Sequence, residues 1–395
     1  MKNKLEVPTV DVARSGGKAA VPVKIVRARL TLRGFKDQDK GDVDRYAGTS
    51  ARGSQKLLVS EAVLRQWDIC TTDISKAFLQ GVTYEELAKL TGEKPREVNF
   101  YLPASNIPLL RKVPGFETFD PQKEVLHCDK PGTGLVDAPK AFSMKLKSIT
   151  RDKLGLIPSA IDPEFCGKME KGELVCLMTI HVDDLKIAGR TDVVKDVLTT
   201  LQKEFGELKI LWNDFTNCGV HHEQDPRTKE ITLDQIAFAD NLRPIAHPEL
   251  STAKNEDKTT PALTQLYQSL LGATAYLAHT RVDALVFISA LQRHNTTPLV
   301  IHVKRLNNVV RWLQRHPKKL AYRRLLTGRG GHPEAGGRAQ GKTVPTHLRI
   351  ISDAAFKREG DSGHCLRGRR VCPGSRDLGV QLPASRPHSH FGVRL

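Results

Sequence analysis

Two adjacent carboxylates, Asp183 and Asp184, lie between the apolar segments Leu174–Ile180 and Leu185–Ala188. Two short apolar runs around His181–Asp184 predict a β-hairpin whose turn carries both acids. Adjacent acids in a tight turn repel each other unless a cation lies between them, and Mg²⁺ prefers carboxylate oxygen. An ordinary polar turn is the alternative, because Asp is common at such positions.

A third acid, Asp73, ends another predicted strand. The segment Asp68–Leu79 predicts a strand followed by a short turn or helix, with Phe78 five residues after Asp73. Two-metal nucleotidyl transfer needs two or three carboxylates that converge from rigid elements. Taken alone, Asp73 also suits a helix N-cap and Phe78 an ordinary core position. The three acids together favour a site for divalent cations, with Phe78 closing a pocket beneath a nucleotide.

The composition restricts the class of protein. The chain has 395 residues, enough for two or three domains, and a net charge of +17 that predicts attraction to polyanions, nucleic acid foremost. Its seven cysteines have no zinc-site spacing, which predicts reduced thiols in an intracellular protein. The N-terminus lacks an apolar signal segment, and no apolar run is long enough to span a bilayer, so neither secretion nor membrane insertion is expected.

Apolar spacing predicts the remaining elements. Val21–Phe35 is expected to be a half-buried strand, and Tyr84–Leu126 a loop-rich insertion. A helix should begin at Ala138, with Pro139 in its first turn. Further helices are predicted at Gln55–Trp67, Thr191–Phe205, Ile231–Leu242, Leu263–Leu277 and Leu299–Arg315, and a strand between residues 344 and 356.

Six blocks of the chain resemble, in order, motifs of the reverse transcriptase of copia-type LTR retrotransposon polyproteins. The resemblance covers about residues 21–356. The matching blocks are Arg27–Phe35, Thr72–Gly81, Gly134–Lys140, His181–Asp184, Thr280–Asp283 and Ile351–Ala355, the last similar to the start of the family's RNase H domain.

The resemblance implies an α+β fold of the right-hand polymerase type, with fingers, palm and thumb, and an antiparallel palm sheet backed by helices. The expected division is a disordered lead-in over residues 1–20, fingers and palm over 21–245, and a thumb- or connection-like helical region over 246–327. A Gly-rich linker would occupy 328–343, and a truncated RNase H start with a disordered basic tail 344–395.

The resemblance also implies roles for single residues. Asp73, Asp183 and Asp184 would be the catalytic acids and would bind two Mg²⁺ ions, with Mn²⁺ as a substitute. The fingers would place their basic side chains on the incoming triphosphate, Phe78 would be a steric gate under the sugar, and the start of the 138–149 helix would place the template. The residues in those last roles are Arg27 and Arg29 for the triphosphate, and Ala138 and Pro139 for the template. From the residues alone, the two arginines equally suit a solvated strand face.

Three departures from the family pattern carry expectations of their own. His181 replaces a tyrosine, and a hydrogen-bonding role in the turn is favoured for it over catalysis. Asp137 replaces a glutamine, and an extra acid there would weaken template binding. RNase H needs four carboxylates, of which only Asp353 is matched, so no RNase H activity is expected.

The predicted function is RNA-directed DNA polymerase. Its substrates would be deoxynucleoside triphosphates and a primer paired to an RNA or DNA template, and it would act inside the cell, in a cytoplasmic particle or the nucleus. One alternative is a degenerate or domesticated nucleic-acid-binding protein without catalysis. It is favoured because little sequence precedes Val21 for the family's first finger strands, and because the family pattern breaks off after Lys357. A two-metal nuclease is another. The sequence carries no signal for the oligomeric state.

Overall fold

The computed structural model describes residues 31–37, 47–324, 348–355 and 365–372. The chain divides into two compact units, residues 1–325 and 326–395. The first unit holds all the motifs of the predicted polymerase active site. The second unit is described only by a pair of antiparallel strands, β13 (Leu348–Ala355) and β14 (Cys365–Cys372).

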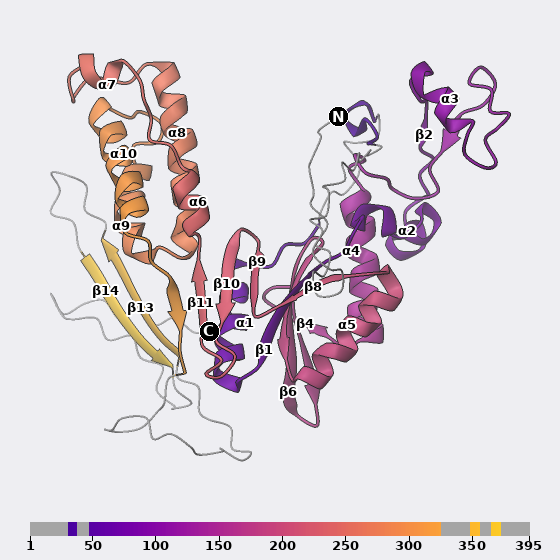
Figure 1. Ribbon diagram of the computed structural model, residues 1–395, viewed down its shortest axis with the longest axis horizontal. Coiled ribbons are helices and arrows are strands. Elements are labelled where there is room, and N and C mark those ends of the chain that lie inside the picture. The colour runs from indigo at the N-terminus through magenta and orange to yellow at the C-terminus, as the bar shows by residue number, and fades with distance from the viewer. Residues whose placement is uncertain (1–30, 38–46, 325–347, 356–364, 373–395) are drawn as a thin grey trace, which may run out of the picture. The chain divides into compact units, whose positions relative to one another are not determined.

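A six-stranded antiparallel sheet forms the centre of the first unit (Figure 1). Its order is β4-β5-β6-β7-β1-β8, which places β1 directly between the hairpin strand β7 and β8. The strands are β4 (Ile157–Pro158), β5 (Phe165–Glu170), β6 (Glu173–His181), β7 (Asp184–Gly189), β1 (Asp68–Asp73) and β8 (Lys209–Trp212).

Helices α4 (Ala138–Ser148) and α5 (Thr191–Phe205) cover one face of this sheet. Helix α5 has Asp192 in its first turn and ends at Gly206, whose positive φ of 84° suits glycine. Its buried residues recur at helical spacing, which is why one side of it packs onto the sheet. They are Val193, Val194, Val197, Leu198, Leu201 and Phe205.

Helix α1 (Arg52–Arg65) and a second antiparallel sheet cover the opposite face. Ile69 and Ala188 point to this side, whereas Cys70 and Ile187 point to α4 and α5, because side chains alternate along each strand. The order of the second sheet is β12-β11-β10-β9. Its strands are β9 (Asp214–Asn217), β10 (Val220–Gln224), β11 (Ile231–Asp234) and β12 (Leu320–Tyr322).

Residues 236–315 form a helical bundle with its own core around Tyr267, whose hydroxyl donates to the carbonyl of Leu291 at 2.8 Å. Thr260 caps α8 and Pro261 occupies its first turn, a favourable start for a helix. The α-helices are α6 (Ile236–Asn241), α7 (Glu249–Thr252), α8 (Pro261–Tyr276), α9 (Leu285–Gln292) and α10 (Val300–Arg315), with 3₁₀ turns at Leu277–His279 and Val282–Ala284.

The segment after β1 is more ordered than a loop-rich insertion. A 3₁₀ turn, Ala77–Gln80, leads into α2 (Tyr84–Thr91), whose N-terminus is closed by a capping box between Thr83 and Glu86. The rest holds β2 (Asn99–Phe100), a 3₁₀ turn (Ala104–Asn106), α3 (Ile107–Leu110) and β3 (Leu126–His127).

Most predicted elements are confirmed, and three further expectations are wrong in part. Residues 231–234 form strand β11, and the predicted helix begins only at Ile236. The described end of the predicted strand Val21–Phe35 contains a 3₁₀ turn, Gly34–Lys36, instead. Strand β14 lies inside the stretch predicted as a disordered tail. The lead-in 1–20 and the linker 328–343 lie outside the described residues.

Among the helices of the described residues, none is both long and apolar enough to cross a bilayer.

Candidate active site

The turn of the β6–β7 hairpin holds the first two acids. His181 pairs with Asp184, so Val182 and Asp183 are the two central turn residues. Val182 has a φ of 59°, a left-handed conformation that is a genuine outlier for a β-branched residue. Strained backbone of this kind costs about 1–3 kcal/mol and clusters at functional sites. The strain presents Asp183 at the tip of the hairpin.

Pairing between β1 and β7 brings the third acid to the same corner. Asp73 lies directly opposite Asp184, and the backbone N–H of Ile74 donates to the carbonyl of Asp183 at 3.2 Å. Residues opposite each other on antiparallel strands have Cα atoms about 4.5–5.5 Å apart. Asp73 and Asp184 also point to the same face of the sheet, because they keep the alternation of Ile69 and Ala188. The backbone pairing therefore brings acids from two separate motifs to one corner of the sheet.

The electrostatics of this corner reflect repulsion among the acids. Burial raises the pKa of Asp184 above its usual value, and the neighbouring Asp183 and Asp73 raise it further, with His181 opposing them. Burial and then Asp183 likewise raise the pKa of Asp73, while Lys209 lowers it. Burial is the larger cause for both acids, and a cation bound here would relieve the part of the shift that comes from the like charges.

The corner does not form a complete metal cage by itself. Within the described residues, no three or more His, Cys, Asp or Glu side chains are already placed to hold a metal ion. Mg²⁺ in phosphoryl-transfer sites takes one or two protein carboxylates and completes its shell with water and substrate phosphate. The paired carboxylates of Asp73 and Asp184 supply hard oxygen donors of the kind that this chemistry uses.

The residue at the bend, His181, is half-buried and its Nδ1 has no hydrogen-bond partner in the described part of the chain. The hydrogen-bonding role favoured for His181 is therefore not filled through Nδ1 by a described group. Its backbone is held instead, because Thr49 forms a β-bridge with it and the N–H of Ser50 donates to the carbonyl of Ile180 at 2.8 Å.

A buried pair of basic side chains, Lys186 and His222, lies close to the acids and was not predicted from the sequence. Lys186 is 2% exposed and its Nζ lies 3.2 Å from Nε2 of His222. Burial lowers the pKa of Lys186 to about 8. Burial and then Lys186 lower the pKa of His222 well below its usual value, so His222 is neutral and accepts from the ammonium. The sequence does carry one indication of this pair: a single lysine in the apolar strand β7, two residues after Asp184 and therefore on the same face of the sheet.

The other predicted site residues that the structure describes differ in how deeply they are buried. Phe78 is partly buried and packs against the core under α4, so its core role is present whether or not it also gates a sugar. Ala138 is fully buried, whereas Pro139 in the first turn of α4 is partly exposed and accessible. Arg27 and Arg29 lie outside the described residues.

Asp137, expected to be an extra acid near the template, is instead a buried structural ion. Its carboxylate pairs with Arg96, whose guanidinium also donates to both carboxylate oxygens of Asp37 at 2.8 and 2.9 Å. Burial and then Asp137 raise the pKa of the neighbouring Tyr84. Arg96 therefore neutralises Asp137 and ties the 83–123 insertion to the start of α4.

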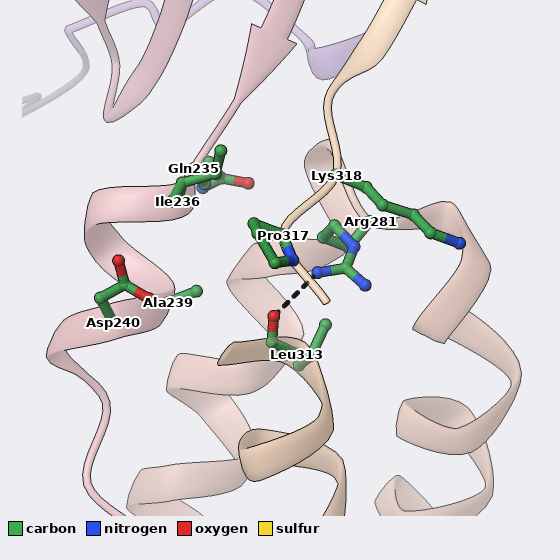
Figure 2. Close-up of a pocket in the computed structure, with 8 residues that line it drawn as sticks. All are labelled: Gln235, Ile236, Ala239, Asp240, Arg281, Leu313, Pro317 and Lys318. Carbon is green, nitrogen blue, oxygen red and sulfur yellow. Dashed lines mark hydrogen bonds between the residues drawn. The ribbon is translucent and has the colours of Figure 1, made fainter. Parts of the chain in front are cut away.

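The Thr280–Asp283 block is also a structural feature. Arg281 is 4% exposed and donates two hydrogen bonds, of 3.0 and 3.1 Å, to the carboxylate of Asp283. Its third nitrogen donates to the carbonyl of Leu313 at 3.3 Å, and its guanidinium lies 5.1 Å from the ring centroid of Trp312 on α10. Figure 2 shows the hydrogen bond between Arg281 and Leu313 beside a small cavity that Gln235 and Lys318 also line.

The fold and the corner define an α+β protein with a strained acidic hairpin on an antiparallel sheet. No family model matches the chain. It is 25% identical over 303 residues to the Retrovirus-related Pol polyprotein from transposon RE2 of Arabidopsis thaliana, and 23% identical over 308 residues to that from transposon RE1. Each match covers 74% of this chain and 19% of the relative, so the chain spans about a fifth of the curated relatives it matches. The predicted resemblance to retrotransposon polyproteins is confirmed.

Proposed function

We propose that the chain is an RNA-directed DNA polymerase domain of a retrotransposon polyprotein. It would add deoxynucleoside triphosphates to a primer 3′-hydroxyl on an RNA or DNA template. The observation that carries the proposal is the pairing of Asp73 with Asp184 beside the strained turn that presents Asp183. In this assignment the six-stranded sheet is the palm, and the helical bundle 236–315 is the thumb.

Asp73, Asp183 and Asp184 would hold two Mg²⁺ ions, or Mn²⁺ in their place. Ions bound there would activate the hydroxyl nucleophile and neutralise charge on the leaving pyrophosphate. The protein's own contribution is rigidity, because β7 is buried from Leu185 to Gly189 and its pairing with β1 fixes Asp184 opposite Asp73. Preorganised charge of this kind needs no rearrangement when substrate arrives.

The remaining assignments follow from accessibility. Phe78 would touch the sugar with the part of its ring that the core leaves open. Pro139 would contact the template, while the buried Ala138 would act only by fixing the start of α4. Arg27 and Arg29 would bind the triphosphate, since a guanidinium suits phosphate oxygens bidentately.

Primer extension tests the proposal. The purified chain, with Mg²⁺, a primed RNA template and deoxynucleoside triphosphates, should lengthen the primer. Asp183→Asn should reduce the rate by about a thousandfold or more, equivalent to about 4 kcal/mol of transition-state stabilisation. Asp196→Asn is a matched control, because Asp196 is an exposed acid on α5. Equal extension by the wild-type chain and Asp183→Asn would show that the acids are not the catalytic groups.

A nucleic-acid-binding protein without catalysis is the second candidate. The absence of a preformed metal cage in the described residues favours it. Filter binding of the same primed template, measured beside extension, separates the two functions. Retention of the template with no product, in Mg²⁺ and in Mn²⁺, would support the binding protein and contradict the polymerase.

A further inference from the structure

A concave surface lies on the side of the six-stranded sheet that α4 and α5 cover. It is a groove of about 930 Å³ between α2, the C-terminal half of α4 and the following π-helical turn, Ile149–Lys153. Asp73 and Asp184 point to the opposite side, toward α1, so the sheet separates the groove from the acidic corner. Whatever the groove binds does not reach the three acids through it.

Positive charge dominates the lining of the groove. Three carboxylates accompany six cations, and the cations are Lys89, Lys130, Lys145, Lys147, Arg151 and Lys153. Three of the cations have carboxylate partners: Lys147 with Glu164 at 2.6 Å, Arg151 with Asp152 at 2.9 Å, and Lys153 with Glu204 at 2.5 Å.

The other three cations, Lys89, Lys130 and Lys145, form no ion pair with a carboxylate of the described chain. Lys145 instead places its ammonium 5.3 Å from the ring centroid of Phe205, which orders its stem without neutralising its charge. These lysines come from α2, the loop before α4, and α4, so they surround the groove rather than lie along one helix.

The floor and walls between these cations are apolar. Leu90 is 58% exposed on the wall, and Met144, Leu156 and Pro158 lie within the groove. A ligand with both apolar and acidic groups would cover this leucine and pair with the lysines around it. The turn Ile149–Lys153 at the groove is π-helical, a rare geometry that is frequent at functional sites.

The lining favours a peptide over a nucleic acid. Among the described residues that line the groove, none is aromatic, so unpaired bases have no stacking platform. Lysine outnumbers arginine five to one, which lacks the bidentate geometry that selects phosphate. Lysine point charges around Leu and Met side chains match carboxylates and aliphatic side chains instead.

We propose that this groove binds an acidic peptide segment of a partner protein. Its Asp or Glu carboxylates pair with Lys89, Lys130 and Lys145, and its aliphatic side chains cover Leu90 and Met144. The inference rests on the groove alone, and it holds whether or not the chain extends primers.

Fluorescence anisotropy on the full chain tests the proposal with a labelled peptide of Glu-Glu-Leu repeats. A Gln-Gln-Leu peptide and oligothymidylate serve as comparison probes. We expect the acidic peptide to bind, and the triple variant Lys89→Gln, Lys130→Gln, Lys145→Gln to weaken it by about tenfold or more, as the loss of three modest ion pairs implies. The matched control removes three exposed lysines elsewhere, Lys112→Gln, Lys171→Gln and Lys195→Gln, and should change binding less than about twofold.

Several results would overturn the proposal. An equal loss of peptide affinity in both triple variants would show general charge attraction. Equal binding of the Gln-Gln-Leu peptide would show that the groove does not recognise carboxylates. Selective loss of oligothymidylate in the groove variant would assign the groove to nucleic acid. Lysine acetylation read by mass spectrometry needs no variant: the acidic peptide should protect Lys89, Lys130 and Lys145 but not Lys112 and Lys195, and uniform labelling would contradict the site.

Discussion

The His181–Asp184 and Thr280–Asp283 blocks both end in aspartate, but the pKa values of the two aspartates are shifted in opposite directions. In the acidic corner, burial and neighbouring carboxylates raise the pKa of Asp184 and of Asp73. In the arginine clamp, formed by Arg281 with Asp283 and Leu313, hydrogen bonds from Arg281 outweigh burial and, with Lys318, lower the pKa of Asp283. A motif match alone does not separate chemistry from architecture. A carboxylate left among like charges indicates a site for a ligand, and one fully matched by cations indicates a structural role.

The largest stability effect is expected in the clamp. Arg281→Met should lower the free energy of unfolding by about 3 kcal/mol, because Asp283 and the carbonyl of Leu313 lose a buried charged partner. Urea unfolding measures it. Arg305→Met, an exposed arginine on α10, is the matched control and should cost less than about 0.5 kcal/mol. A small effect for both variants would mean that the clamp is not structural.

The two aspartates should respond to the same substitution with opposite signs. Asp184→Asn should raise the free energy of unfolding by roughly 0.2–1 kcal/mol, because it removes like charges that face each other across β1 and β7. Asp283→Asn should lower it by about 1–2 kcal/mol, because a buried guanidinium loses a charged acceptor. Primer extension should fail in the first variant and persist in the second. The same sign of stability change in both would break the comparison.

The strained turn at Val182 predicts that one substitution stabilises the fold. Val182→Gly should raise the free energy of unfolding by about 1 kcal/mol, because glycine adopts a positive φ without a Cβ clash, less its greater entropy in the unfolded chain. Val182→Ala keeps an L side chain at this position and is the control. If thermal unfolding shows no gain for glycine over alanine, the turn is not strained in solution.

The smallest effect is a pH dependence in the second sheet. Burial alone would lower the pKa of His221, but hydrogen bonds with Asp214 and Asp234, at 2.9 and 3.1 Å, outweigh it and raise the pKa. A raised folded-state pKa stabilises the fold fully below the unfolded value of about 6.5 and loses this contribution as pH rises through the folded value. His221→Gln should therefore cost stability at pH 5.5 and little at pH 9.

The histidine is partly exposed, so its contribution should stay below about 1 kcal/mol. His127→Gln is the control, since the described chain pairs His127 with Asn99 rather than with a carboxylate. A pH-independent loss in His221→Gln would show a packing effect instead of an ionic one.

The helices were the most predictable part of the fold. Thr191–Phe205 was predicted with the bounds of α5, because its apolar stripe, its acidic first turn and the following glycine all act locally. Strands β8 to β12 escaped prediction, since they have three to five residues, too few to show periodicity, and are stabilised by partners distant in sequence.

The sequence by itself determined which residues could do chemistry: Asp73 at a strand end, and Asp183 and Asp184 in a turn between two apolar segments. Only the tertiary structure decided what surrounds them. The pairing of Asp73 with Asp184, the burial of Lys186 on His222, and the neutralisation of Asp137 by Arg96 each join segments from 36 to 111 residues apart. Local residue preferences act over a few positions, whereas charge and burial depend on distances in space. The pKa and the role of a carboxylate therefore became readable only once the chain was folded.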